Sequence, residues 1–280
     1  MTRSLTVLAL TFAAAALAAA DVPLVSFDFE TNLVNQGSLA GEARFQTYAP
    51  GEEPVFGLGP FGRCLDLTAA ARHGGSSAQD LPSGGALLFS NAALDSLDNF
   101  TLVLWARQSP LAQGPNARLL HKPGAWDLVA HPAGLTLALG PDAAKVTYPL
   151  TGKAKLNLSA NWCFFAVAVT PQSVAAFIGS QQQPLQPAGE APRHDQGAAS
   201  ANGLLLGNLG GIRPFNGWMD RVRVFRGALD EPALRAFFEA DLASVKEIIA
   251  PQVAELGRVP ATNRSFRLTP SAIPFSTRWA

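Results

Sequence analysis

Short apolar runs that alternate with polar residues recur along the chain, and clusters of Gly, Pro, Asn and Ser separate them. Alternation with a period of two is typical of a β-strand with one buried face, whereas Gly and Pro interrupt helices. Runs with strand character are 25–29, 64–67, 100–105, 118–120, 126–130, 135–139, 146–148, 162–169, 174–178, 203–206 and 218–225. The pattern predicts an all-β fold, an antiparallel two-sheet β-sandwich (jelly roll), in which 118–120 and 126–130 form a hairpin.

Helical periodicity appears late, after Leu229. Asp230 is a good N-cap, and the apolar residues behind it recur at steps of three and four: Leu234, Phe237, Phe238, Leu242, Val245, Ile248 and Ile249. We therefore predict a C-terminal helix that begins at Glu231 and ends or kinks at Pro251. Its apolar face is expected to pack on the sandwich and to bury Leu234, Phe237 and Phe238. Two polar stretches, 72–85 and 181–203, are predicted to be surface loops, and 259–280 an irregular tail.

Residues 1–20 have the layout of a secretory signal peptide. Arg3 is followed by a short Ala-rich apolar stretch and by three alanines before Asp21. A membrane anchor requires a longer and usually bulkier apolar segment. We expect cleavage near Asp21 and export to the periplasm or the cell exterior, with no membrane span. The expected organisation is a signal peptide over 1–20, a sandwich domain over 21–240, and a helical extension with an irregular tail over 241–280.

Two cysteines, Cys64 and Cys163, occur in the chain. Because an exported protein enters an oxidising environment, the two are predicted to form a disulfide. Each also lies in an apolar run, and the alternative is two separate thiols buried in the core. Neither belongs to a C-x-x-C pair, so metal binding by cysteine is not expected.

The charge balance argues against one class of partner. The chain of 280 residues contains 21 Lys plus Arg and 21 Asp plus Glu, and its basic residues do not form long runs. Binding to nucleic acid requires a basic surface that neutralises phosphate groups. A nucleic-acid partner is therefore not expected.

The string FNGWMDRVRVFRGALDE at 215–231 resembles the last strand and following turn of laminin G-like jelly-roll domains, which belong to the concanavalin A-like superfamily. The family pattern there is F-x-G-x-I-D-E-V-R-[IV]-Y-x-R-A-L-S. Segments 27–30, 62–67, 100–105, 161–167 and 204–207 agree with the family in the same order, so the resemblance covers 21–240. It implies the two-sheet sandwich and a binding or adhesion function.

Many members of this family bind calcium through acidic side chains and carbonyl oxygens. Here Arg221 stands where the family usually has Glu, and Asn35 replaces the Asp that opens a D-x-S-G turn. These departures argue against calcium, and no metal or cofactor is predicted. Asp220 is expected to share a face with Val222 and Val224, where its carboxylate needs a hydrogen-bond or metal partner.

The sequence lacks the patterns of common catalytic sites, namely G-x-S-x-G, H-E-x-x-H and a phosphate loop. Gly57-x-Gly59-x-x-Gly62 matches a dinucleotide-binding pattern, but Pro60 and the strand-like run behind it indicate a turn. Glycoside hydrolases of the resembled superfamily commonly carry an E-x-D-x-x-E strand, which this sequence lacks. No catalytic residue is predicted. The histidines are interpreted as solvated residues in or beside loops: His73, His121, His131 and His194.

Tryptophans are candidates for sugar binding, because aromatic rings stack on pyranose faces. Trp105 and Trp162 occupy strand positions that the resembled family fills with core aromatics, and Trp279 lies in the tail. Trp126 follows a Pro-Gly-Ala turn, and Trp218 begins the last strand. These two are predicted to be exposed and to bind ligand.

We therefore expect an exported, non-catalytic binding or adhesion module whose ligand is a carbohydrate. The expected partner is a glycan or a cell-surface or matrix protein. Two alternatives remain open at this point. One is a structural envelope or matrix component that binds another protein, and the other is a glycoside hydrolase of the same fold.

Overall fold

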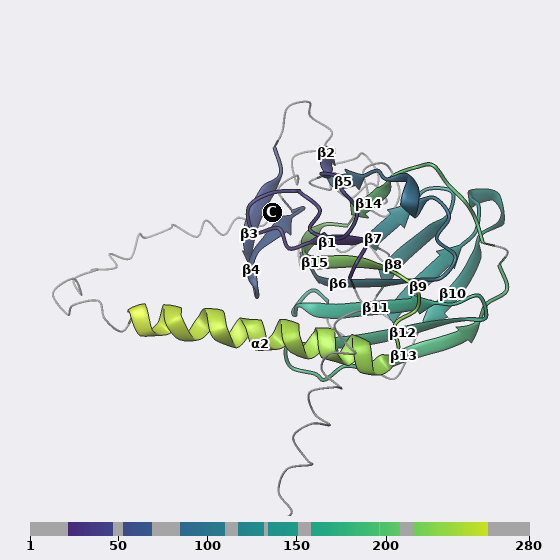
Figure 1. The fold of residues 1–280 in the computed structure, drawn as a ribbon. Helices are drawn as coiled ribbons and strands as arrows, with labels where there is room; N and C mark the ends of the chain where they lie inside the picture. Colours follow the sequence, from purple (N-terminus) through teal and green to yellow (C-terminus); the bar gives the residue numbers. More distant parts are fainter. Residues whose placement is uncertain are drawn as a thin grey trace, which may run out of the picture.

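A computed structural model of the chain describes residues 22–46, 53–68, 85–109, 117–131, 134–150, 158–195, 197–207 and 215–256. Two antiparallel β-sheets are stacked as a sandwich, and one long helix, α2 (Glu231–Leu256), lies along one side (Figure 1). The predicted all-β sandwich with a C-terminal helix is confirmed. The predicted signal peptide, the loop at 72–85 apart from its last residue, and the tail at 259–280 lie outside the described residues.

Within the described residues, one sheet has eight strands in the order β13-β12-β11-β6-β15-β4-β3, with β1 also paired to β15. Its strands are β1 (Val25–Phe27), β3 (Val55–Gly59), β4 (Gly62–Asp66), β6 (Phe100–Gln108), β11 (Cys163–Val169), β12 (Ser173–Ser180), β13 (Gln186–Pro192) and β15 (Gly217–Arg226). We call the face of this sheet that is turned away from the other sheet the outer face.

The other sheet has seven strands within the same residues, in the order β10-β9-β8-β7-β14-β5-β2. Its strands are β2 (Arg44–Gln46), β5 (Ala86–Phe89), β7 (Ala117–Lys122), β8 (Trp126–His131), β9 (Gly134–Leu139), β10 (Val146–Leu150) and β14 (Leu204–Gly207). Short 3-10 helices, η1 (Ala92–Leu94) and η2 (Asp142–Ala144), follow β5 and β9. β7 pairs antiparallel with β8, which confirms the predicted hairpin.

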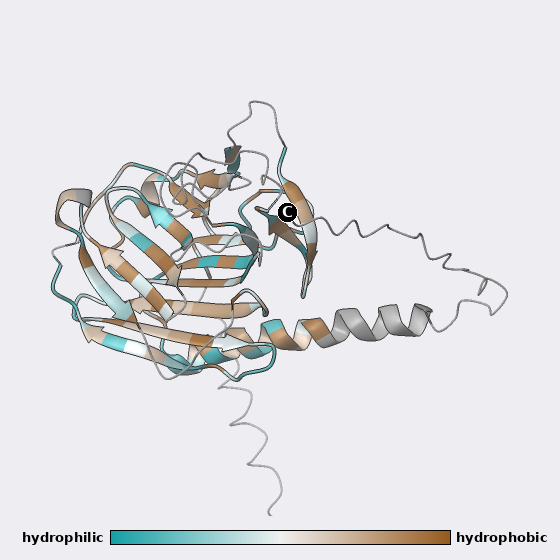
Figure 2. Cartoon of the chain, turned by 180° about the vertical axis from the view of Figure 1, so that it is seen from behind, coloured by the Kyte–Doolittle hydropathy of each residue, from teal (hydrophilic) through white to brown (hydrophobic). Residues whose placement is uncertain are grey.

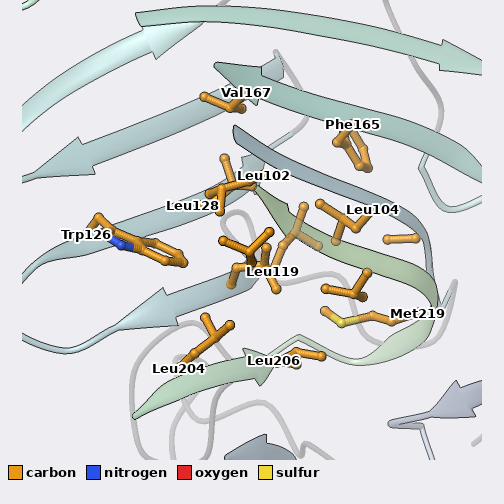
Figure 3. Close-up of a cluster of buried hydrophobic side chains, with 14 of the residues drawn as sticks. Leu102, Leu104, Leu119, Trp126, Leu128, Phe165, Val167, Leu204, Leu206 and Met219 are labelled. Atoms are coloured by element: carbon orange, nitrogen blue, oxygen red, sulfur yellow. The ribbon is translucent and has the colours of Figure 1, made fainter. Parts of the chain in front are cut away.

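The main core lies between the two sheets. Alternate residues of facing strands point inward, so β6 contributes Leu102 and Leu104 while β8 contributes Trp126 and Leu128 (Figure 3). These four side chains are at most 3% exposed. Figure 2 shows the resulting alternation of hydrophilic and hydrophobic residues along the strands. Burying one such aliphatic side chain contributes about 1.5–3 kcal/mol.

The predicted surface loop at 181–203 is partly wrong, because β13 lies inside it. β13 pairs with β12 at the edge of the eight-stranded sheet, and the register shifts between the pairs Ala176 with Gly189 and Phe177 with Pro187. Ala188, the extra residue at this bulge, is 1% exposed. An edge strand tolerates proline because no second neighbour requires the missing N–H donor. Pairing with β12 thus makes a strand of a segment whose composition favours a loop.

The helix α2 begins where the sequence predicts. The backbone N–H of Ala233 donates to Oδ1 of Asp230 at 2.9 Å, so Asp230 is the N-cap. The helix continues through Pro251 to Leu256, so it does not end at Pro251, and the alternative of a kink there stays a prediction. A proline inside a helix removes one hydrogen bond without having to end the helix. Among the described residues, no helix is both long and apolar enough to cross a membrane.

The N-terminal half of α2 packs on the outer face of the eight-stranded sheet. Leu234 and Phe238 are buried, and the Phe238 ring stacks on Trp105 of β6 with centroids 5.6 Å apart. Phe237, which was expected to be buried as well, is partly exposed, and its ring centroid lies 5.1 Å from that of Phe225. The predicted contact between the helix and the sandwich is therefore present, with a second hydrophobic cluster beneath it.

A buried carboxylate also ties α2 to the sheet. Asp241 is 2% exposed and accepts hydrogen bonds from Trp105 Nε1 at 2.8 Å, from Arg221 at 2.6 Å, and from Arg223 at 2.8 and 3.0 Å. Burial alone would raise the pKa of Asp241. The hydrogen bonds and charges of the two arginines outweigh burial and hold this pKa below its usual value. Apolar packing and one ion-pair cluster together hold the helix.

The predicted disulfide between Cys64 and Cys163 is wrong, because both thiols are free and buried. Cys64 on β4 belongs to the hydrophobic cluster of the outer face, whereas Cys163 on β11 belongs to the core between the sheets. Strands β15 and β6 lie between β4 and β11. The cysteines are therefore about 14 Å apart across the sheet, and a disulfide requires Cα atoms within about 7 Å.

Both thiols are expected to resist alkylation in the folded protein and to react fully in denaturant without any reductant. Burial raises the pKa of Cys64 and of Cys163 to about 12, so little thiolate forms at neutral pH. Intact mass after iodoacetamide treatment, with and without denaturant, measures the outcome. Denatured protein that reacts only after reduction would show that a disulfide exists.

Candidate functional site

Three side chains on neighbouring strands form a row across the outer face of the eight-stranded sheet. Trp218 of β15 lies directly opposite Asp66 of β4 on one side and Arg107 of β6 on the other. Residues directly opposite each other on antiparallel strands project from the same face. Trp218 packs against the outer-face cluster, so all three side chains project from the outer face. We call Asp66, Trp218 and Arg107 the Trp218 row.

The indole of Trp218 is partly exposed and lies beside Arg107 and Gly57. The guanidinium carbon of Arg107 lies 5.5 Å from the ring centroid, a cation–π distance. On strand β3, which pairs with β4, a Cβ placed on Gly57 would lie 3.5 Å from Trp218 Cδ1 and 3.6 Å from Asp66 Oδ2. These are ordinary van der Waals distances, so the missing side chain of Gly57 leaves room for a methyl-sized group next to the indole and the carboxylate.

The two polar members of the row differ in their hydrogen bonds. Oδ1 of Asp66 accepts hydrogen bonds from the backbone N–H of Thr68 at 2.8 Å and from its hydroxyl at 2.6 Å, which orient the carboxylate. Arg107 is partly buried, and its Nε is buried with no hydrogen-bond acceptor among the described residues. The row therefore has an oriented hydrogen-bond acceptor, Asp66, on one side of the indole. On the other side it has Arg107, whose Nε can still donate a hydrogen bond.

This combination of groups suits a sugar ring. The C–H face of a pyranose packs on an indole, and a few polar groups at the edge of the contact fix its orientation. Hydroxyl groups donate to a carboxylate and accept from a guanidinium. The Trp218 row holds one group of each kind.

One of the two tryptophans predicted to bind ligand is buried. Trp218 is partly exposed, whereas Trp126 is 3% exposed and stacks on Phe100 with ring centroids 5.6 Å apart. Figure 3 shows Trp126 among the side chains of the core. The prediction that Trp126 is exposed is therefore wrong, because the alternation of β8 places its first residue on the inner face. Trp105 and Trp162 are buried, as predicted.

Asp220 lies on the outer face and does not share a face with Val222 and Val224, which belong to the core between the sheets. The pairing of β15 with β6 changes register between Asp220 and Arg223, and Arg221 has a positive φ of 47°. This β-bulge inserts one residue, which reverses the alternation of the strand. The expectation that Asp220 points the same way as the two valines is therefore wrong.

Asp220 is buried, and its two carboxylate oxygens differ in their hydrogen bonds. Its Oδ1 accepts a hydrogen bond from the backbone N–H of Arg221 at 2.8 Å, whereas Oδ2 is buried without a partner in the described part of the chain. Burial raises the pKa of Asp220 well above its usual value, which favours the neutral carboxyl group. The described residues contain no cluster of three or more His, Cys, Asp or Glu side chains placed to hold a metal ion.

The glycines of the dinucleotide-like pattern lie in a hairpin. Gly57 and Gly59 belong to β3, and Gly59 pairs with Gly62 of β4 across the turn that contains Pro60. The interpretation of this pattern as a turn that leads into a strand is confirmed, and the strand before the turn, β3, was not predicted. His121, predicted to be a solvated loop residue, is instead part of β7 and only 9% exposed.

Sequence reasoning missed two members of the row, Asp66 and Arg107. A usable signal was present for each. Asp66 lies within the predicted strand 64–67, and Arg107 continues the alternation that begins at Trp105, so both belong to strands. What places them beside Trp218 is the strand order β4-β15-β6, which no local pattern contains.

No protein-family profile and no curated protein matches the sequence. Among solved structures, domain 4 of AbnA, a GH43 extracellular arabinanase from Geobacillus stearothermophilus in complex with arabinotriose, matches with a TM-score of 0.57 and 15% identity. The match covers 77% of this chain and 97% of that one. The binding domain of Paraclostridial Mosquitocidal Protein 1 matches with a TM-score of 0.60 and 13% identity, over 79% of this chain and 52% of that one.

A third similar structure is the binding domain of Botulinum Neurotoxin DC in complex with SialylT. Its TM-score is 0.53 at 15% identity, over 79% of this chain and 52% of that one. This chain therefore spans about half the length of the two toxin binding domains. At these identities the likeness shows the fold alone. Fold and site together define a β-sandwich domain that carries the Trp218 row on the outer face of one sheet.

Proposed function

We propose that the protein is an exported, non-catalytic carbohydrate-binding module and that the Trp218 row is its binding site. The observation that carries this proposal is the partly exposed indole of Trp218, with a carboxylate on one side and a guanidinium on the other. The fold supports the proposal, because similar sandwiches were solved with arabinotriose and with SialylT. The signal-like segment at 1–20 supports export.

We also propose a relationship to laminin G-like domains. The string at 215–231 that carries this resemblance forms β15, the turn behind it and the first residue of α2. In this proposal the domain acts by adhesion, holding the protein on a glycan of a cell surface or matrix.

Replacing Trp218 by alanine is expected to weaken glycan binding by about tenfold or more, because the variant loses the stacking surface for the sugar ring. The measurement is isothermal titration calorimetry of the full chain with an oligosaccharide first identified on a glycan array. Phe237→Ala is the matched control, because Phe237 is another partly buried aromatic residue of the outer-face cluster that lies outside the row. Thermal melting of each variant checks that it is folded.

Equal affinities of the wild type and Trp218→Ala for the same glycan would place the binding site elsewhere. Hydrolysis of any glycan on the panel would instead favour a glycoside hydrolase. Failure to bind every glycan tested would overturn the proposed function.

A further inference from the structure

Arg107 differs from the other partly buried arginines of the described residues, because each of the others is paired with a carboxylate. The pairs are Arg118 with Asp127, Arg193 with Asp98 and Asp195, Arg221 and Arg223 with Asp241, and Arg235 with Glu231. In the described part of the chain, Arg107 forms no ion pair, contacts the Trp218 ring, and has a buried Nε without an acceptor. Among these residues, its partly buried guanidinium is therefore without an anion.

An unpaired buried N–H group is unfavourable, because the group has lost its hydrogen bonds to water without replacing them. The strongest acceptors for a guanidinium are planar or tetrahedral oxyanions, which accept two parallel hydrogen bonds from the same fork. A hydroxyl group accepts only one such bond and carries no charge. The arrangement at Arg107 therefore favours an anionic ligand group over a neutral one.

Asp66 does not serve as that anion. It lies on the far side of Trp218, two strands away from Arg107, which is a distance of about 10 Å across the sheet. At this distance the interaction between two partly exposed charges is largely screened at physiological salt. Asp66 therefore neither neutralises Arg107 nor strongly repels an anion that is bound there.

We propose that the Trp218 row selects glycans that carry an anionic group, a carboxylate or a sulfate ester, and that Arg107 binds this group. The inference rests on the proposed function and specifies its substrate class. The sugar ring contacts the exposed part of the indole, its anionic group accepts hydrogen bonds from Arg107, and a hydroxyl group donates to Asp66. Trp218 supplies affinity for any sugar ring, whereas Arg107 supplies the preference for charge.

The test compares each anionic glycan with its own neutral form. The probes are oligogalacturonate against the same oligomer after carboxyl reduction, and dextran sulfate against dextran, each titrated at physiological salt. A wider array of uronate-containing, sialylated and sulfated glycans, each with a neutral counterpart, extends the comparison. The wild-type chain is expected to bind at least one anionic form about tenfold more tightly than its neutral counterpart. A preference in the oligogalacturonate comparison identifies a carboxylate as the anion, and a preference in the dextran sulfate comparison identifies a sulfate ester.

In Arg107→Gln the ratio between the affinities for the anionic and the neutral form is expected to fall to about one, because the anionic form loses more affinity than the neutral form. Arg107→Lys keeps the positive charge but cannot donate two parallel hydrogen bonds to one anionic group. This variant is expected to keep only part of the preference for the anionic form. The matched control is Arg63→Gln, which removes the same charge from an exposed residue of β4 and is expected to keep the ratio. Melting curves check that each variant is folded.

Equal binding of both forms by the wild type, or an unchanged ratio in Arg107→Gln, would overturn the anionic preference and leave the proposed carbohydrate function standing. Loss of binding to both forms in Trp218→Ala supports the shared site. If the wild type binds none of the anionic or neutral glycans, the proposed function and this inference both fail. Because the comparison of the two forms uses the wild-type chain, it does not depend on any variant being folded.

Discussion

Replacing Phe238 by alanine is expected to lower the free energy of unfolding by about 3–5 kcal/mol. The side chain is 3% exposed, stacks on Trp105, and meets Phe164 edge-on with ring centroids 5.3 Å apart. It also lies directly against Gly179 of β12, where an added Cβ would come within 2.8 Å of the Phe238 ring. Truncation therefore removes a large buried surface and leaves a cavity between helix and sheet.

Phe237→Ala is the internal control for this prediction, because Phe237 is adjacent in sequence but partly exposed. Phe237→Ala is expected to lower the free energy of unfolding by a smaller amount, about 1–2 kcal/mol, because Phe237 buries less area than Phe238. Urea denaturation followed by tryptophan fluorescence measures both variants. A loss below about 1 kcal/mol for both would mean that α2 does not pack on the outer face in solution.

Replacing Asp241 by alanine is expected to cost about 3–5 kcal/mol, because the change removes one partner of a buried ion pair and leaves the others behind. Trp105 Nε1 loses its acceptor, and Arg221 and Arg223 lose the carboxylate that they share. The same denaturation assay measures this effect. Glu239→Ala is the matched control, since Glu239 is an exposed acidic residue of the same helix and its loss is expected to have little effect.

The contribution of Asp241 is also expected to depend on pH. Its pKa in the folded chain lies below the value of about 3.9 for an unfolded aspartate, so folding favours the ionised form. The stabilisation is therefore present above that unfolded value and is lost as the pH falls through the folded pKa. The stability difference between the wild type and Asp241→Ala should be largest near neutral pH and should shrink below about pH 4. A difference that stays constant with pH would contradict the charge-based account.

Local sequence patterns predicted most of the secondary structure, because burial of one face produces a period that is visible in the sequence. The run at 135–139 alternates in sequence, and β9 alternates in burial at the same positions. The helix start at Glu231 was predictable from the Asp230 cap, which is also a local interaction. Strands β2, β3, β5 and β13 were missed. The glycines of β3 and the prolines of β13 carry no strand signal, and both strands lie at sheet edges, where a single neighbouring strand supplies the pairing. β2 and β5 are only three and four residues long, too short to show a clear period.

The candidate site was predictable only in part. Trp126 and Trp218 each begin an apolar run after a turn, and nothing local distinguishes them. In the folded chain Trp126 points into the core and Trp218 points to the outer face. The pairing of each strand with its neighbours decides which of its residues face the core. The bulge at Arg221 shows how sensitive this outcome is, since one inserted residue moves Asp220 to the opposite face from Val222.

The sequence by itself determined that this chain folds as a β-sandwich with a C-terminal helix, because the periods of buried residues are local properties. Tertiary structure alone decided that Cys64 and Cys163 are apart and that Asp66, Trp218 and Arg107 are together. Both outcomes depend on strand order and register between segments that are distant in sequence. Strand order and register depend on how all the strands together bury their apolar faces. The hydrophobic period of a single strand therefore does not predict them.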